Sequence, residues 1–188
     1  MKALLFDMDG VVLDSKEVWI AAFKEAANMS REEIESKLVW GADVRDNLRR
    51  VGIDDLDSFR SVFNKHLDKV KVPEAIKLIL EKTEYKKALI TNTTYELTKM
   101  ILEKAELFEY FDSVVTCDQV ERGKPSPDMI FKACENLDVR PQEAVIIGDS
   151  SNDMEAGKAA GCSTIGLGIE GDYTIQKIDE LPGILKQI

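Results

Sequence analysis

Five short apolar segments are spaced along this chain of 188 residues, and each has the length of a buried β-strand. Between most of them lie segments with helical spacing of apolar residues, such as Leu97, Ile101 and Leu102. Strands that alternate with helices pair in parallel, because each helix carries the chain back across the sheet. We therefore predict an α/β fold, with a parallel sheet of about five strands sandwiched by helices. The expected strands are Lys2–Phe6, Lys87–Ile90, Ser113–Thr116, Ala144–Ile147 and Ser163–Leu167, and the expected helices are Pro73–Thr83, Tyr95–Ala105, Pro127–Leu137 and Asn152–Ala160.

The segment from residue 15 to residue 72 breaks this alternation, because its pattern indicates consecutive helices. The first contains Val18–Phe23, and Ser30-Arg31-Glu32-Glu33 has the capping-box pattern that opens a second helix. Asp43–Val51 and Asp55–Val70 are the expected third and fourth helices, separated at Gly52. We predict a core made of residues 1–14 and 73–188, with a small all-helical insert, residues 15–72, after the first strand.

The first apolar segment ends in Asp7-Met8-Asp9-Gly10. Side chains alternate along a strand, so Asp7 and Asp9 point the same way. Two carboxylates this close repel each other, and one of them holds its proton more tightly unless a cation lies between them. The pattern indicates a nucleophile supported by a metal ion, with a proton donor beside it.

Polar residues also follow the other expected strands. The second strand leads into Thr91-Asn92-Thr93-Thr94, and the fourth leads into Gly148-Asp149-Ser150-Ser151-Asn152-Asp153. The third leads, after several residues, to Gly123-Lys124-Pro125-Ser126-Pro127. In an open parallel sheet, ligands bind beyond the carboxyl ends of the strands. Acids, hydrogen-bond donors and one cation are therefore expected to share one rim of the sheet.

In order and spacing, these segments together resemble the four motifs of the haloacid dehalogenase-like superfamily. Asp7 to Ser15 matches Asp-x-Asp-Gly-x-x-x-Asp-Ser, and Thr91 matches the hydroxyl residue that ends the second strand. Gly123 to Pro127 matches Gly-Lys-Pro-x-Pro, and Gly148 to Asp153 matches Gly-Asp-Ser-x-x-Asp. The chain looks most like the phosphoglycolate phosphatase and β-phosphoglucomutase subgroup. The resemblance implies a Rossmann-like core, with residues 15–72 as a helical cap.

The resemblance also implies the roles of the acidic residues. Asp7 would attack phosphorus and form an aspartyl-phosphate. Asp9 would protonate the leaving oxygen and then deprotonate the incoming water. Mg²⁺, which prefers oxygen ligands, would be held by Asp7, by the main-chain carbonyl of Asp9 and by Asp149. Asp153 would orient metal-bound water from the outer shell.

The remaining predicted site residues would bind the phosphate group. Lys124 would offset the negative charges of Asp7 and of the phosphate. The Thr91 hydroxyl and Asn92 would bind phosphate oxygens, as would main-chain N–H groups at the start of a helix.

The resulting functional hypothesis is a Mg²⁺-dependent phosphatase that hydrolyses a small phosphorylated metabolite. Two alternatives remain at this point. A phosphomutase resembling β-phosphoglucomutase shares the motifs and differs in passing the phosphoryl group to a sugar hydroxyl instead of water. A catalytically silent binding protein on the same fold is the other alternative.

The net charge of −10 argues against nucleic acid as a partner, since phosphate contacts require basic residues. No apolar stretch reaches the length of a membrane span, and no signal segment is evident. Three cysteines without metal-type spacing indicate reduced thiols. We expect a cytoplasmic monomer or weak dimer that binds neither nucleic acid nor membranes.

Two further groups of residues have structural interpretations. Trp19 and Trp40 are expected to pack in the core or within the insert, and the alternative is that they stack on a ligand. Arg45, Arg49 and Arg50 are expected to form a solvated helix face with ion pairs to nearby acids. The functional alternative is that one of these arginines reaches the site and binds a second anionic group of the substrate.

Overall fold

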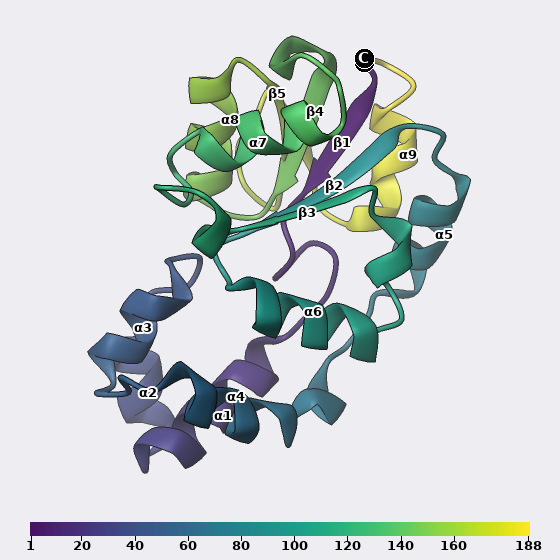
Figure 1. Ribbon diagram of the computed structural model, residues 1–188. Coiled ribbons are helices and arrows are strands. Elements are labelled where there is room, and N and C mark those ends of the chain that lie inside the picture. Colours follow the sequence, from purple (N-terminus) through teal and green to yellow (C-terminus); the bar gives the residue numbers. More distant parts are fainter.

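The computed structural model describes all residues from 1 to 188 and contains one six-stranded sheet (Figure 1). All strand pairs are parallel, in the order β3-β2-β1-β4-β5-β6. The central strand β1 pairs with β2 on one side and with β4 on the other, so that Leu5 lies between Ala88 and Ile146. The strands are β1 (Ala3–Phe6), β2 (Lys86–Thr91), β3 (Ser113–Thr116), β4 (Ala144–Gly148), β5 (Ser163–Leu167) and β6 (Tyr173–Ile175).

Helices cover both faces of the sheet, as Figure 1 shows. On one face, α7 (Asp128–Asn136) and α8 (Ser151–Ala160) pack against alternate strand residues such as Leu5 and Ile146. The other face, with Leu4 and Phe6, belongs to the larger core. That core also includes residues of α5 (Glu74–Lys82), α6 (Tyr95–Lys104) and α9 (Leu181–Ile184). Burial on both faces explains why the strands are continuously apolar, and the predicted α/β architecture is confirmed.

The sheet has one strand more than the sequence predicts. Strand β6 has only three residues, and of these Ile175 alone is buried. A three-residue edge strand with one buried side chain leaves no apolar run in the sequence. It is recognisable only from its pairing with β5, in which Tyr173 lies opposite Ile165.

Four helices lie between β1 and α5: α1 (Lys16–Ala27), α2 (Arg31–Lys37), α3 (Val44–Arg50) and α4 (Leu56–Asn64). The capping box at Ser30 is present, with reciprocal hydrogen bonds between Ser30 and Glu33. The expected continuous helix over Asp55–Val70 is wrong, because α4 ends at Asn64 and a separate 3-10 turn follows. The 3-10 turns of the chain are Leu67–Lys69, Phe108–Tyr110, Cys117–Gln119, Pro141–Glu143 and Ile178–Glu180.

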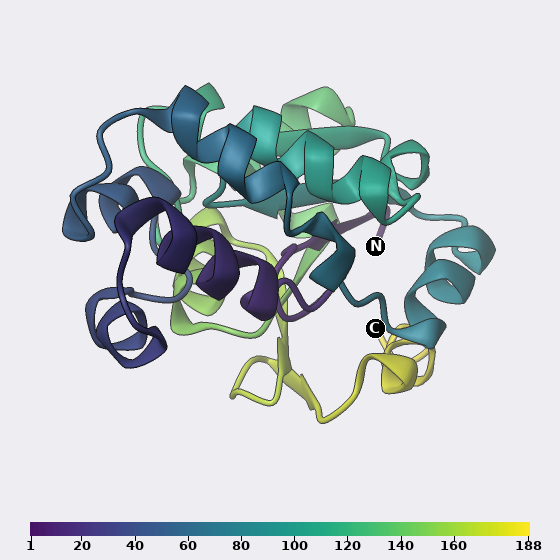
Figure 2. The ribbon, with the colours of Figure 1, turned by 90° about the horizontal axis from the view of Figure 1, so that it is seen from below.

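The helical segment leaves the core and returns to it at one place. Asp14 and Lys71 form an isolated antiparallel bridge, with two main-chain hydrogen bonds of 2.8 and 3.0 Å. In Figure 2, α1 to α3 lie on the left, and both chain termini lie on the right. The segment has its own aromatic cluster, in which Trp19, Phe23, Phe59 and Phe63 lie with ring centroids 4.5 to 6.4 Å apart. None of the chain's helices is long and apolar enough to cross a membrane.

Candidate active site

Three adjacent strands deliver polar side chains to one edge of the sheet. Asp7 follows the last residue of β1, Thr91 ends β2, and Asp149 follows the last residue of β4. After β1, the chain adds β2 and β3 on one side of that strand and then adds β4, β5 and β6 on its other side. The carboxyl end of β1 therefore lies at the point where ligands bind in open α/β sheets.

A cavity of about 360 Å³ lies at this edge, between the sheet and the helical segment. Its walls come from both parts of the chain, since strand-end residues and residues of α1 and α3 line it. Asp153 does not line the cavity, and it is fully buried beneath it. The predicted site residues that do line it are Asp7, Asp9, Thr91, Asn92, Lys124 and Asp149.

Lys124 is a buried cation held between two buried carboxylates. Its Nζ lies 2.7 Å from Asp7 Oδ1 and 2.6 Å from Asp153 Oδ1, and it also donates to the Ile90 carbonyl oxygen at 3.2 Å. Burial by itself lowers the pKa of Lys124, but the charges of Asp153 and Asp7 outweigh burial and raise the pKa above its ordinary value. The ammonium group is therefore charged and fixed, with all three protons used.

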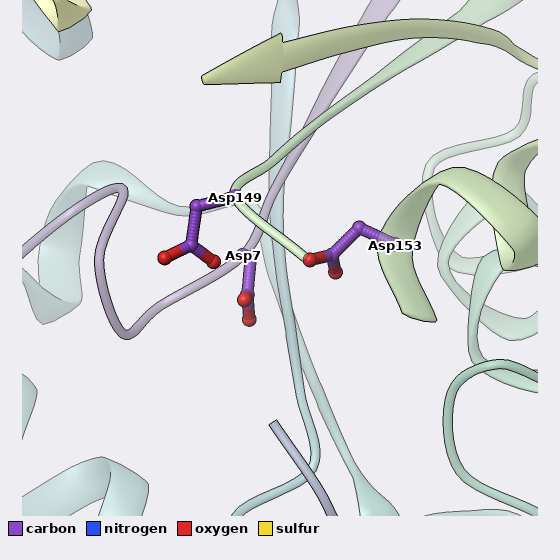
Figure 3. Close-up of side chains that lie close together, drawn as sticks. All are labelled: Asp7, Asp149 and Asp153. Atoms are coloured by element: carbon purple, nitrogen blue, oxygen red, sulfur yellow. The ribbon is translucent and has the colours of Figure 1, made fainter. Parts of the chain in front are cut away.

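The carboxylates of Asp7, Asp149 and Asp153 lie close together (Figure 3). One oxygen from each lies within 4.8 Å of the others. Burial first, and then the Asp153 charge, raise the pKa of Asp7 well above its ordinary value. The same two causes raise the pKa of Asp149 to about 6. One lysine does not offset this many carboxylates, so the cluster fits a divalent cation bound by oxygen ligands.

Asp9 lies beside this cluster with a different set of partners. Its Oδ1 accepts hydrogen bonds from the Ser15 hydroxyl and from Trp19 Nε1, the latter at 3.2 Å. Burial raises the pKa of Asp9, and the bonds from Ser15 and Trp19 oppose that shift. Trp19 packs within the helical segment as predicted, and its contact with Asp9 is an additional finding. The spacing of residues in the sequence does not predict this contact, because the contact depends on how α1 packs against the end of β1.

Asn92 holds two loops together through its side-chain amide. Its Nδ2 donates to the main-chain oxygens of Gly41 at 2.7 Å and Lys124 at 2.9 Å, and its Oδ1 accepts from the Lys124 N–H at 2.9 Å. Both amide protons are thus used within the protein, and Asn92 as a phosphate-binding residue stays a prediction. A Cβ at Gly123 would lie 2.4 Å from Asn92 Oδ1, so only glycine permits this approach. Thr91, by contrast, has a cavity-lining hydroxyl whose oxygen accepts from the Thr93 N–H at 3.2 Å.

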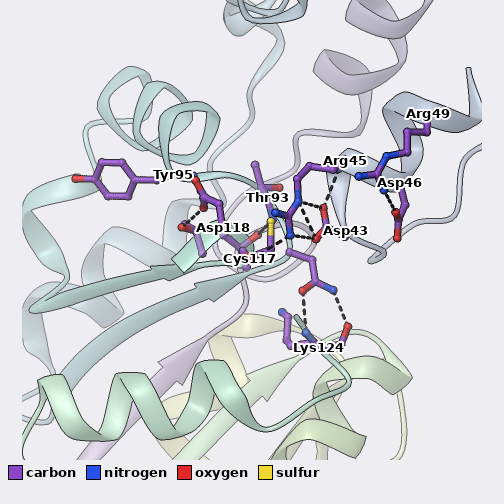
Figure 4. Close-up of polar contacts among 12 residues, drawn as sticks. Asp43, Arg45, Asp46, Arg49, Thr93, Tyr95, Cys117, Asp118 and Lys124 are labelled. Atoms are coloured by element: carbon purple, nitrogen blue, oxygen red, sulfur yellow. Dashed lines mark hydrogen bonds and ion pairs between the residues drawn. The ribbon is translucent and has the colours of Figure 1, made fainter. Parts of the chain in front are cut away.

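The arginines of α3 do not line the cavity. Arg45 pairs with Asp43 at 2.5 Å and donates to the Cys117 carbonyl oxygen, while Arg49 pairs with Asp46 at 2.7 Å (Figure 4). The predicted ion pairs to nearby acids are therefore confirmed for Arg45 and Arg49. Trp40 differs from expectation, because its side chain is 43% exposed and lines the cavity.

The topology and the placement of these motifs define a hydrolase class. The family model described as haloacid dehalogenase-like hydrolase matches residues 4–167, and the chain belongs to this family of enzymes. The resemblance noted in the sequence is thereby confirmed.

Particular relatives extend this comparison over most of the chain. Phosphoglycolate phosphatase of Aquifex aeolicus is 34% identical, over 87% of this chain and 83% of that protein. Pyrophosphatase PpaX of Bacillus mycoides is 28% identical, over 100% of this chain and 98% of that protein. The crystal structure of a HAD phosphatase from Thermococcus onnurineus has a TM-score of 0.78 and 27% identity, and the match covers 98% of both chains.

Proposed function

We propose that this enzyme is a Mg²⁺-dependent phosphatase that hydrolyses a small phosphorylated metabolite through an aspartyl-phosphate, with residues 15–72 acting as the cap. The observation that carries the proposal is the placement of Asp7. Its carboxylate lies just after the end of the central strand, bonded to Lys124, beside two further carboxylates and lining the cavity. Relatives named as phosphatases support the same reaction class.

The donor set suits Mg²⁺. Carboxylate oxygens of Asp7 and Asp149 and the main-chain carbonyl of Asp9 would hold the ion, with Asp153 close enough to orient its water ligands. When bound, the ion supplies positive charge to the phosphate oxygens and to the carboxylate cluster. Lys124 would supply a second, permanent positive charge at Asp7.

Asp7 is held ready to attack. Its Oδ1 accepts from Lys124 Nζ and from the Met8 N–H, both at 2.7 Å, and these bonds fix the orientation of the carboxylate. Attack forms a bond from the Asp7 carboxylate to phosphorus and breaks the bond from phosphorus to the ester oxygen. Water then attacks the same phosphorus, which releases phosphate and restores the carboxylate.

Asp9 would move the proton in both steps. Burial raises its pKa, so its carboxyl group begins protonated more often than an exposed aspartate does. It would give this proton to the departing alkoxide and then take a proton from the attacking water. Ser15 and Trp19 hold the carboxyl group in place from the cap side while these transfers occur.

The cap would shield the reaction from bulk water. Asn92 connects it to the core, because its amide bonds to Gly41 in the helical segment and to Lys124 in the core. The main-chain N–H of Val44 also donates to the Asn92 carbonyl oxygen at 3.0 Å. We therefore assign Asn92 a positioning role, while Thr91 remains the proposed hydroxyl ligand of the phosphate.

The test is an Asp7→Asn variant beside an Asp54→Asn control, which makes the same change at an exposed position. With Mg²⁺ and a panel of phosphate esters, Asp7→Asn is expected to release phosphate only at background rate, while Asp54→Asn matches the parent enzyme. Acid-quenched parent enzyme should carry one phosphoryl group by mass spectrometry, and Asp7→Asn should carry none. Near-normal turnover by Asp7→Asn would refute the mechanism. Isomerisation of a phosphosugar without phosphate release would refute the hydrolytic function.

A further inference from the structure

The charged side chains around the cavity are strongly biased toward acids. Two basic residues line it, Lys16 and Lys124. Lys124 is already bonded to Asp7, Asp153 and a main-chain oxygen, so it has no proton left for a leaving group. The acidic lining residues are Asp7, Asp9, Asp14 and Asp149.

Lys16 is therefore the one cavity-lining cation that could bind a charged leaving group. Its ammonium group already lies over an aromatic ring. Its Nζ lies 5.5 Å from the centroid of the Trp40 ring. No arginine lines the cavity, and two arginines of α3 are bound elsewhere, Arg45 to Asp43 and the Cys117 carbonyl, and Arg49 to Asp46 (Figure 4). A leaving group with two negative charges, such as a second phosphate, would meet one partly engaged lysine and the Asp14 carboxylate.

The cap-side wall is apolar instead. Phe23, Leu38 and Val44 line it, each less than 10% exposed. Asn47, a polar side chain of the same wall, uses its amide on the main chain of Val39, with contacts of 2.9 and 3.0 Å. This wall therefore offers surface for an apolar group and few free hydrogen-bond donors for a charged one.

Trp40 supplies a large open surface at the same place. Its side chain is 43% exposed although it lines the cavity, so part of the indole has no protein partner. It stands next to Gly41, whose carbonyl oxygen is held by Asn92 and Asn152 at 2.7 and 3.1 Å. The indole is thus carried on an anchored segment of the cap, as a stacking platform requires.

We propose that the leaving group of the substrate is uncharged and carries a ring that stacks on Trp40, so that the enzyme prefers ring-bearing phosphomonoesters over phosphoglycolate and pyrophosphate. This inference rests on the proposed phosphatase function. It extends that function by naming the substrate class and by making Trp40 a specificity residue.

Binding of two phosphonates with the same head group tests the inference without turnover. Titration calorimetry of the full chain with Mg²⁺ compares benzylphosphonate, which carries a ring, with phosphonoacetate, which carries a carboxylate. Benzylphosphonate is expected to bind about tenfold more tightly, the size of one good aromatic contact. Equal affinity, or tighter binding of phosphonoacetate, would overturn the inference.

Variants identify the residue responsible. Trp40→Ala should remove the preference for benzylphosphonate, and Trp40→Phe should retain most of it. Phe131→Ala removes a comparably exposed aromatic on α7, outside the cavity, and should leave the preference unchanged. A preference that survives Trp40→Ala would refute the assigned role. Circular dichroism would establish that each variant is folded.

Measurements of hydrolysis distinguish a failure of the substrate-class inference from a failure of the proposed phosphatase function. If benzylphosphonate is preferred but benzyl phosphate is hydrolysed no faster than by Asp7→Asn, the substrate-class assignment stands and the phosphatase function fails. If phosphate esters are hydrolysed but phosphoglycolate or pyrophosphate has a higher kcat/KM than benzyl phosphate, the function stands and the inference fails.

Discussion

Replacement of Lys124 by methionine tests the electrostatic centre of the site. The ammonium group lies 2.7 Å from Asp7 and 2.6 Å from Asp153, and all three side chains are at most 10% exposed. Methionine keeps most of the length and apolar contacts of lysine but removes its charge. The two carboxylates would then share a buried region without their common partner.

Lys124→Met is expected to lower the free energy of unfolding strongly, because it leaves the buried charges of Asp7 and Asp153 without a partner. Breaking a buried ion pair in this way costs about 3–5 kcal/mol. With a urea slope of about 2 kcal/mol/M, the unfolding midpoint should fall by about 2 M. Surface ion pairs give no such effect, since their loss costs about 1 kcal/mol or less.

Urea unfolding at pH 7 with a chelator present measures this cost without a metal ion to replace the lost charge. Lys158→Met is the control, because it makes the same change at an exposed position of α8. A loss below about 1 kcal/mol for Lys124→Met, or an equal loss for both variants, would refute the reasoning.

The pH dependence of the variant has a definite sign. Burial and the Asp153 charge already raise the pKa of Asp7, and Lys124 opposes that rise. Without Lys124 the folded-state pKa rises further above the unfolded value, so the folded variant binds more protons than the unfolded chain. Its stability should therefore increase as the pH falls from 7 toward 5, and the deficit against the parent should shrink.

Two further substitutions test the loops and the metal site. Asn92→Ala removes three hydrogen bonds, one to Gly41 in the helical segment and two to the main chain of Lys124, so it should lower the free energy of unfolding by about 1–3 kcal/mol and reduce kcat. Asn152→Ala, which loses one bond to Gly41, should cost less, and equal effects on urea unfolding and kcat would contradict the assignment. Asp149→Ala should raise the Mg²⁺ concentration for half-maximal activity by about tenfold or more, since even indirect partners of a metal ion contribute that much. An unchanged Mg²⁺ titration, matching that of the exposed-site control Glu155→Ala, would argue against Asp149 as a ligand.

Local patterns predicted much of the core because its strands are buried on both faces. Continuous apolar runs at Ala3–Phe6 and Ala144–Gly148 are compatible with few structures other than buried strands. The capping box at Ser30 marks the start of a helix, because its hydrogen bonds form within four consecutive residues. The same logic failed at Tyr173–Ile175, where the edge of a sheet demands only one buried side chain. It also failed after Asn64, where an apparently helical pattern is divided into a helix and a turn.

The same distinction between local sequence pattern and tertiary contact applies to the side chains of the site. The sequence by itself determined that acids and a hydroxyl stand at the carboxyl ends of parallel strands, because strand direction requires it. Tertiary structure alone decided that Asn92 joins two loops and that Trp19 bonds to Asp9, since these contacts join residues 10 to 51 positions apart. It also left Trp40 open at the cavity, because the path of the chain before Gly41 sets where that ring stands.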